Sequence, residues 1–82
     1  MLVRPVKYRD LVKILKKFGL YIDKSRGKGS ERLIVKGTPP QLTYPIPFRT
    51  ENDDVKRCYI RVIRQKFKLT PEDGVSDQGF YG

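Results

Sequence analysis

Residues 8–36 read YRDLVKILKKFGLYIDKSRGKGSERLIVK, and this stretch decides the fold. Four apolar residues near its start follow the spacing i, i+3, i+4, i+7; they are Leu11, Ile14, Leu15 and Phe18. That spacing predicts a helix over 8–18 with one face packed against the rest of the protein. Gly19 follows the last apolar position and suits the left-handed conformation that ends many helices.

Short apolar segments after this helix predict three strands, at 20–22, 31–36 and 42–48. The third segment contains Pro45 and Pro47, which lack backbone donors on the same side of a strand. That loss is tolerable only where this side faces solvent. We therefore expect the third strand at the edge of an antiparallel meander whose strands follow their sequence order.

A second helix is predicted over 52–68. Asn52 is a suitable N-cap, and Asp53 and Asp54 suit the positive end of the helix dipole. At about 100° per residue, an apolar and a cationic set of side chains fall on opposite faces. The apolar set is Val55, Tyr59, Val62 and Ile63, and the cationic set is Arg57, Arg61, Arg64 and Lys68.

The element order is α-β-β-β-α, which predicts an α+β domain over 1–70. We expect a three-stranded antiparallel sheet with both helices on one face, because two amphipathic helices need a shared apolar surface. The other face is left for solvent or a ligand. Residues 71–82 are Gly-rich, acidic and aperiodic, and are predicted to form a disordered tail.

The 82-residue chain carries a net charge of +9, and the charge is uneven. All 18 Lys and Arg lie in residues 1–70 with six acidic residues, so that part carries +12. A basic body suits a polyanionic partner such as nucleic acid. A membrane surface is disfavoured because no basic amphipathic helix stands apart from the core. The alternative is a basic soluble protein without an anionic ligand.

Cysteine usage and hydropathy predict a cytoplasmic protein. The one cysteine, Cys58, excludes an internal disulfide and argues for a reducing compartment. Because no histidine is present to pair with it, we expect Cys58 to be a small buried residue and not a nucleophile. No apolar run approaches the roughly 20 residues needed to span a bilayer.

The loop before the second predicted strand reads KSRGKGS over 24–30 and combines glycines with cations. Glycines allow the backbone to approach a bulky anion, and flanking cations hold it. We interpret this loop as a site for a phosphate chain, with a plain connector as the alternative. Ser30 could donate a hydrogen bond to phosphate, or serve only in the turn; as a nucleophile it lacks a histidine base.

Four features together resemble the HicA toxins. They are the helix YRDLVKILKKFG, Gly29-Ser30 opening the second strand, the strand Thr43-Tyr44-Pro45-Ile46, and Val62-Ile63-Arg64-Gln65 in the second helix. HicA proteins are messenger-RNA interferases of bacterial and archaeal toxin–antitoxin pairs, and HicB antitoxins neutralise them. The resemblance, over about residues 6–69, implies a fold like a double-stranded-RNA-binding domain and endoribonuclease activity. It also implies mRNA and a HicB-like protein as partners, and no cofactor.

The chain departs from the HicA pattern at the position of the catalytic histidine, because Glu31 follows Gly29-Ser30 here. Two further positions differ, with Pro47 in place of a second histidine and Lys66-Phe67 in place of Ala-Gly. Cleavage by the 2′-hydroxyl needs a proton acceptor and a donor, and histidine, with a reference pKa of about 6.5, serves as either.

A carboxylate, with a reference pKa of about 4.3, is a weak base when ionised and repels phosphate. Glu31 is therefore a candidate general base, with Ser30 beside it. The alternative, which we favour, is that Glu31 is a solvent-facing strand residue paired with an arginine or lysine.

Nine cations are candidate RNA-binding residues: Lys24, Arg26, Lys28, Arg32, Lys36, Arg57, Arg61, Arg64 and Lys68. Binding through phosphate contacts should weaken steeply as salt rises. The cationic helix face could equally be plain surface or an antitoxin-docking face. No metal is expected at Glu51, Asp53 and Asp54, because neighbouring helical side chains diverge and helix capping explains them better.

Two hypotheses remain open for the function. The chain is either a ribonuclease in which Glu31 replaces the histidine, or a module that binds RNA or an antitoxin without cleaving. A DNA-binding protein ranks last, because no predicted helix carries base-reading side chains.

Overall fold

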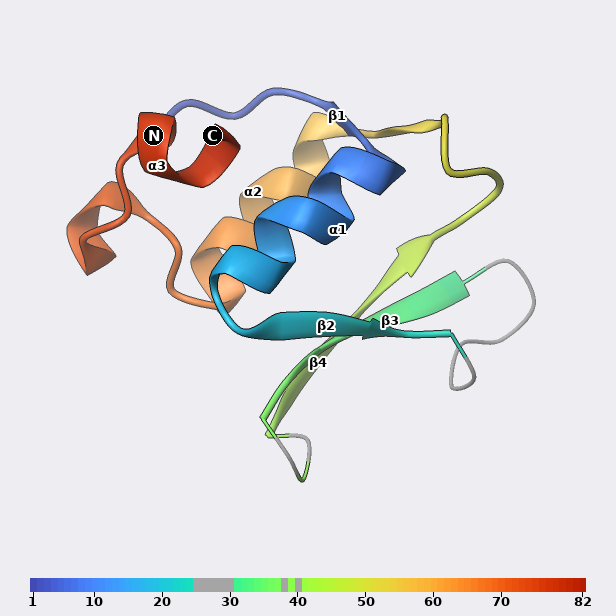
Figure 1. The fold of residues 1–82 in the computed structure, drawn as a ribbon. Coiled ribbons are helices and arrows are strands. Elements are labelled where there is room, and N and C mark those ends of the chain that lie inside the picture. Colours follow the sequence, from blue (N-terminus) through green and yellow to red (C-terminus); the bar gives the residue numbers. More distant parts are fainter. Residues whose placement is uncertain (25–30, 38, 40) are drawn as a thin grey trace.

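Two helices, α1 and α2, lie on one side of a three-stranded antiparallel sheet (Figure 1). This computed structural model describes residues 1–24, 31–37, 39 and 41–82. The elements in chain order are β1 (Val6–Lys7), α1 (Tyr8–Lys17), β2 (Leu20–Asp23), β3 (Glu31–Lys36), β4 (Leu42–Pro47), β5 (Asp54–Val55), α2 (Arg57–Lys66), the 3-10 helix η1 (Pro71–Asp73) and α3 (Asp77–Tyr81). The predicted α-β-β-β-α order of an α+β fold is confirmed, and four short elements add to it.

Helix α1 packs through the apolar stripe that its sequence predicts. Leu11 and Leu15 are fully buried on this stripe, and the helix ends at Lys17, close to the predicted end. Gly19 has φ of +75°. Glycine adopts this left-handed conformation without a steric penalty, so the chain turns directly into β2.

The sheet has the order β2-β3-β4, as the proline pattern predicts. Pro45 lies opposite Leu33, and Pro47 lies opposite Glu31. Strand β4 is at an edge, where only one row of backbone donors is needed for pairing, so it tolerates two prolines.

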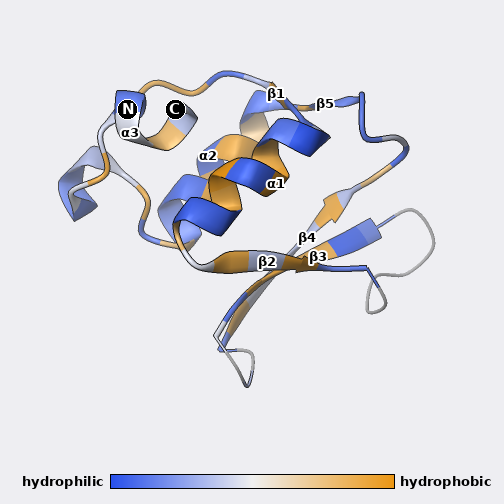
Figure 2. Ribbon diagram, in the orientation of Figure 1, coloured by the Kyte–Doolittle hydropathy of each residue, from blue (hydrophilic) through white to orange (hydrophobic). Residues whose placement is uncertain are grey.

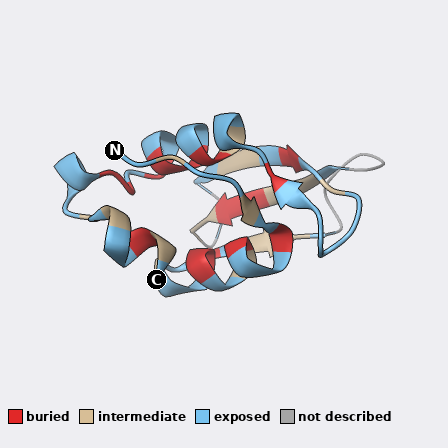
Figure 3. Ribbon diagram, turned by 90° about the horizontal axis from the view of Figure 1, so that it is seen from above, coloured by how far each residue is buried: buried red, intermediate tan, exposed pale blue. Residues whose placement is uncertain are grey.

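Hydrophobic residues run along the strands and alternate with hydrophilic ones on α1 and α2 (Figure 2). Buried residues of both helices and of the strands together form the core (Figure 3). Within the described ranges, no helix combines the length and the apolar character needed to cross a membrane.

Helix α2 begins later than predicted, at Arg57 and not near Asn52. Its N-cap residue is Lys56, whose side chain makes no capping hydrogen bond. The predicted role of Asn52 as N-cap of this helix is therefore wrong. Instead, Asn52 Oδ1 accepts a hydrogen bond from the guanidinium of Arg9 at 2.8 Å.

The acidic segment before α2 caps α1 instead. The carbonyl of Asp53 accepts from the N–H of Tyr8 at 2.9 Å, and that of Glu51 accepts from the N–H of Arg9 at 3.1 Å. These bonds satisfy N–H groups that a helix leaves without intrahelical partners. Strand β5 then pairs with β1, with Val55 opposite Val6. The backbone carbonyls of this acidic segment therefore cap α1, which is distant in sequence, and not α2.

The buried face of α2 also differs from the prediction. Ile60, Ile63, Arg64 and Phe67 are buried and follow the spacing i, i+3, i+4, i+7. Val62, predicted to be apolar-facing, is 36% exposed. The prediction failed because an arginine occupies one core position of this stripe. Cys58 is exposed, so its expected burial is wrong as well.

Residues 71–82 do not form the predicted disordered tail. They fold into η1 and α3, and Phe80 is fully buried with its ring centroid 6.1 Å from that of Phe18. Ser76 caps α3 by accepting a hydrogen bond from the N–H of Gly79 at 2.9 Å. Phe80, with Val75 and Tyr81 packed beside the core, supplies the apolar surface that fixes this mostly polar segment.

Arg64 holds this C-terminal segment in place. It donates from Nε to Leu69 O at 2.8 Å, from NH1 to Leu2 O at 2.9 Å and to Asp77 Oδ1 at 2.7 Å, and from NH2 to Val75 O at 3.2 Å. Its guanidinium lies 4.6 Å from the centroid of the Phe80 ring. The hydrogen bond from Arg64 holds the pKa of the Asp77 carboxyl below its usual value. Arg64 is fully buried, so its predicted contact with RNA is wrong.

Candidate nucleic-acid interface

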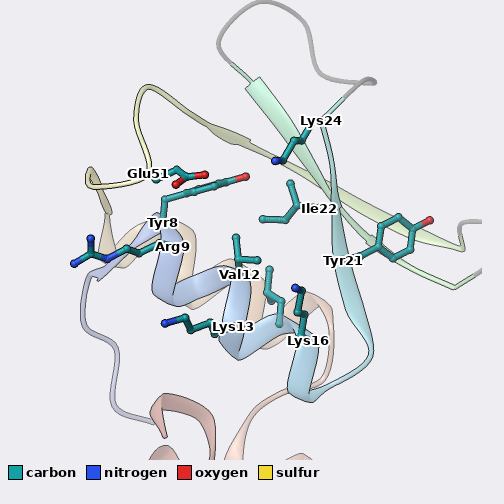
Figure 4. A pocket seen from close by; sticks show the side chains of 10 residues that line it. Tyr8, Arg9, Val12, Lys13, Lys16, Tyr21, Ile22, Lys24 and Glu51 are labelled. Atoms are coloured by element: carbon teal, nitrogen blue, oxygen red, sulfur yellow. The ribbon is translucent and has the colours of Figure 1, made fainter.

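A hollow of about 390 Å³ lies between α1 and β2 (Figure 4). Its lining combines the outer flank of α1, the edge strand β2 and one residue of the segment before β5. The lining residues are Tyr8, Arg9, Val12, Lys13, Leu15, Lys16, Tyr21, Ile22, Lys24 and Glu51. The apolar stripe of α1 packs inward, so the polar flank beside the stripe is left facing this hollow.

Four of these residues are exposed cations, namely Arg9, Lys13, Lys16 and Lys24. Lys16 from α1 and Lys24 from the end of β2 extend from opposite walls toward the space between them (Figure 4). In the part of the chain that the structure describes, none of the three lysines has an ion-pair partner. Uncompensated like charges along a concave surface concentrate anions there.

Apolar side chains form the floor of the hollow. Leu15 is fully buried, and Val12 and Ile22 are half-buried. Figure 4 shows that this floor is built from both sides, with Val12 coming from α1 and Ile22 from β2. An apolar floor beneath a cationic rim can hold a flat apolar group that is linked to phosphate.

Arg32 contacts two aromatic residues next to the hollow. Its guanidinium lies 3.4 Å from the ring centroid of Phe48 and 5.5 Å from that of Tyr8. It also donates a hydrogen bond to Tyr8 Oη at 3.2 Å. The two rings meet edge to face with centroids 4.5 Å apart. The predicted RNA-binding residue Arg32 is therefore half-buried and fixes the position of Tyr8.

The sequence-based list missed Arg9, Lys13 and Lys16, which line the hollow. Lys13 and Lys16 lie off the apolar stripe, and this position could have marked them as solvent-facing. The missing information was tertiary, because only the packing of α1 against β2 places them opposite Lys24.

The other predicted binding residues separate into groups. Lys24 lines the hollow, whereas Arg26, Lys28 and Ser30 lie outside the described residues. Lys36 pairs with Leu20 at the end of β3 away from the loop. Arg57, Arg61 and Lys68 are exposed on and after α2, which lies behind α1 in the view of Figure 1. Arg64, the fourth member of the predicted cationic face, is buried and is not part of this exposed set.

Glu31 is exposed at the first position of β3, opposite Pro47. Successive strand residues point to opposite faces, and Arg32 points toward Tyr8 of α1. Glu31 therefore points to the sheet face away from the helices and the hollow. The expectation of solvent exposure is confirmed, but no described arginine or lysine pairs with its carboxylate.

Among the described residues, no group of three or more His, Cys, Asp and Glu side chains is arranged to hold a metal ion.

Comparisons with models of known protein families, with curated proteins and with solved structures find no match for this chain.

Proposed function

We propose that this chain is a HicA-like RNA-binding protein of a toxin–antitoxin pair, which binds mRNA at the hollow between α1 and β2. The observation that carries the proposal is the placement of Lys16 and Lys24 on facing walls, with Arg9 and Lys13 beside them. The α-β-β-β-α order and the meander of β2, β3 and β4 agree with the fold that the resemblance implies.

The test of binding is a mobility-shift titration of the protein with a long mRNA across a salt series. We expect a complex in dilute buffer whose affinity falls by orders of magnitude between about 50 and 200 mM salt, as phosphate contacts require. A protein that leaves the RNA unshifted in dilute buffer would remove the proposal.

By resemblance, the proposal extends to endoribonuclease activity, with Glu31 in the position of the histidine. Because Glu31 lies on the sheet face away from the hollow, cleavage requires that the bound RNA also reach that face. RNA binding and RNA cleavage can be tested separately, because binding needs only the cations whereas cleavage needs proton transfer. Purified protein is incubated with mRNA without added metal and the RNA is run on a denaturing gel. Cleavage that disappears in Glu31→Ala supports the enzyme, and a complex with intact RNA supports a module that only binds.

The substitution Glu31→His sharpens this test. It introduces an imidazole whose reference pKa, about 6.5, allows proton transfer near neutral pH. If the remaining site is competent, the variant gains cleavage with an optimum near that pH while binding RNA as the parent does. A variant that binds RNA but leaves it intact argues against a latent nuclease site.

We further propose a cytoplasmic HicB-like antitoxin as protein partner. The support is the resemblance together with the excess of exposed cations, which suits an acidic surface. Co-expression with the product of the adjacent gene followed by purification through a single tag tests this. Failure to recover a complex at low salt would remove the partner without affecting RNA binding.

A further inference from the structure

We propose that the hollow between α1 and β2 binds one unstacked nucleotide of single-stranded RNA, with the base on Val12 and Ile22 and a phosphate beside Lys16 and Lys24. This inference rests on the proposed RNA binding and deepens it, because it names the form of RNA that the site takes.

The size and shape of the hollow favour a single strand over a duplex. Its volume of about 390 Å³ falls within the roughly 300–1,000 Å³ of sites that enclose small ligands. A duplex keeps its bases stacked inside and presents mainly phosphates and sugars to a protein. A base can enter this hollow only if it leaves the stack, which single-stranded RNA allows at little cost.

The walls match the two chemical parts of a nucleotide. Val12 and Ile22 face each other and offer apolar surface to the faces of a base. Lys24 and Lys16 lie on either side of these two residues, Lys24 just after β2 and Lys16 near the end of α1, where they can contact the backbone on either side of that base (Figure 4). A flat cationic surface would bind phosphates equally well. The apolar floor is needed only if an apolar group such as a base also binds.

Glu51 argues for a nucleotide and against a bare phosphate. Among the described residues that line the hollow, it is the one acidic side chain, and it lies beside Tyr8 at one end (Figure 4). An ionised carboxylate only accepts hydrogen bonds and repels phosphate. Base amino groups and ribose hydroxyls donate hydrogen bonds, so this end suits the base or sugar.

The first test fills the hollow. Val12→Trp places an indole over the floor, and the matched control is Val62→Trp at an exposed apolar position of α2. We expect Val12→Trp to weaken binding of a short single-stranded RNA about tenfold, because the indole occupies the space that the base needs; for comparison, a loss of this size is within the range that one stacked base contributes. Its affinity for an RNA duplex, and both affinities of Val62→Trp, should change less than about twofold.

A second measurement needs no variant. The methyl signals of Val12 and Ile22 are followed by NMR while the protein is titrated with AMP, ribose 5-phosphate or inorganic phosphate. We expect ring-current shifts at both methyl groups with AMP only, and shifts at the lysine signals with all three. This result holds even if Val12→Trp fails to fold.

The outcomes separate this inference from the proposed function. If wild-type protein binds single-stranded RNA and Val12→Trp binds it equally well, the nucleotide site is overturned while RNA binding stands. Equal affinity for duplex and single strand, with no methyl shifts on AMP addition, also overturns it. If the wild-type protein binds neither RNA, the proposed function fails first.

Discussion

Two groups of cations in this small protein have opposite environments. Arg64 is fully buried, donates to three backbone carbonyls and one carboxylate, and stacks near Phe80. Lys16 and Lys24 are exposed on facing walls of the hollow, and among the described residues neither has an ion-pair partner. The difference shows that a positive charge in the sequence does not by itself mark a side chain as exposed and available to a ligand.

The sequence alone assigns Arg64 to the wrong group. Helical periodicity places it with Arg57 and Arg61, which are exposed. The deciding contacts come from Leu2 and Asp77, near the two ends of the chain. A guanidinium offers five donors in a fixed fork, so it can tie together several segments where a lysine would not.

The largest effect that tests this comparison is expected for Arg64→Ala. The substitution leaves three buried or part-buried carbonyls without their donor and breaks the ion pair with Asp77. We expect a loss of roughly 3–5 kcal/mol in the free energy of unfolding, because each buried or part-buried carbonyl left without a donor costs about 1–3 kcal/mol. Urea denaturation followed by circular dichroism measures it.

The matched control for that experiment is Arg61→Ala, which removes the same side chain from an exposed position of the same helix. Its expected change lies within about 0.5 kcal/mol. If the two variants were equally stable, the buried network of Arg64 would carry no stability, and the distinction between the two groups of cations would lose its basis.

A smaller effect is expected from Asp77→Asn. Arg64 keeps its bonds to Leu69 O, Leu2 O and Val75 O, so the loss should be well below that of Arg64→Ala. The pKa of the Asp77 carboxyl is lowered from 3.8, mainly by the hydrogen bond from Arg64. Because this pKa is lower in the folded than in the unfolded state, the ionised carboxyl stabilises the fold at pH values above its unfolded-state pKa. That stabilisation is lost as the pH falls through the folded-state pKa.

The pH dependence therefore has a definite sign. The stability difference between the parent and Asp77→Asn should be constant near neutral pH and should shrink as pH falls below about 3.8. Thermal unfolding of both proteins across this range measures it. A difference that grew in acid would contradict the assigned role of the Asp77 charge.

Local patterns in the sequence were sufficient for the sheet and for α1. The stripe of Leu11 and Leu15 fixes the helix, and Gly19 ends it. Pro45 and Pro47 place β4 at an edge because they limit its pairing. Each of these inferences depends on residues that are close together in the chain.

The failures all involve partners far apart in sequence. Asp53 lies just before β5, shortly before α2, but its backbone carbonyl accepts a hydrogen bond from the N–H of Tyr8 at the start of α1. Val75, Phe80 and Tyr81 show no helical or strand period in their acidic segment, yet Phe80 is fully buried and the other two pack against the core. The hollow could not be predicted for the same reason, because Lys16 and Lys24 come from elements whose packing angle no local pattern sets.

A change in RNA binding without a change in stability is expected for Lys16→Ala combined with Lys24→Ala. If each lysine contacts one phosphate of a single strand, the slope of log affinity against log salt should fall by about 1.4. Fluorescence anisotropy with a labelled single-stranded RNA at several salt concentrations measures the slope. The control is Lys66→Ala, which removes an exposed charge of α2 away from the hollow. An equal loss of slope in this control would mean that net charge alone governs binding.

The smallest effect is expected for Arg57→Ala combined with Arg61→Ala. Both side chains are exposed on α2, which lies behind α1 in Figure 1 and contributes none of the described lining residues of the hollow. Their loss should change the salt slope by clearly less than the pair Lys16 and Lys24 does, because distant charges are screened within a Debye length of about 8–10 Å. The same anisotropy series measures it, with unfolding free energy as a check on the fold.

An equal loss of slope in this α2 variant would extend the RNA-binding surface across the helix. Arg57 and Arg61 would then belong with Lys16 and Lys24, and the predicted cationic face would hold for every member except Arg64. Unused donors would still mark the binding residues, because Arg64 alone among the four predicted cations of this face is buried and fully engaged. The variant with Arg57→Ala and Arg61→Ala thus measures how far the proposed binding surface extends, while Arg64→Ala tests the structural role of the buried arginine.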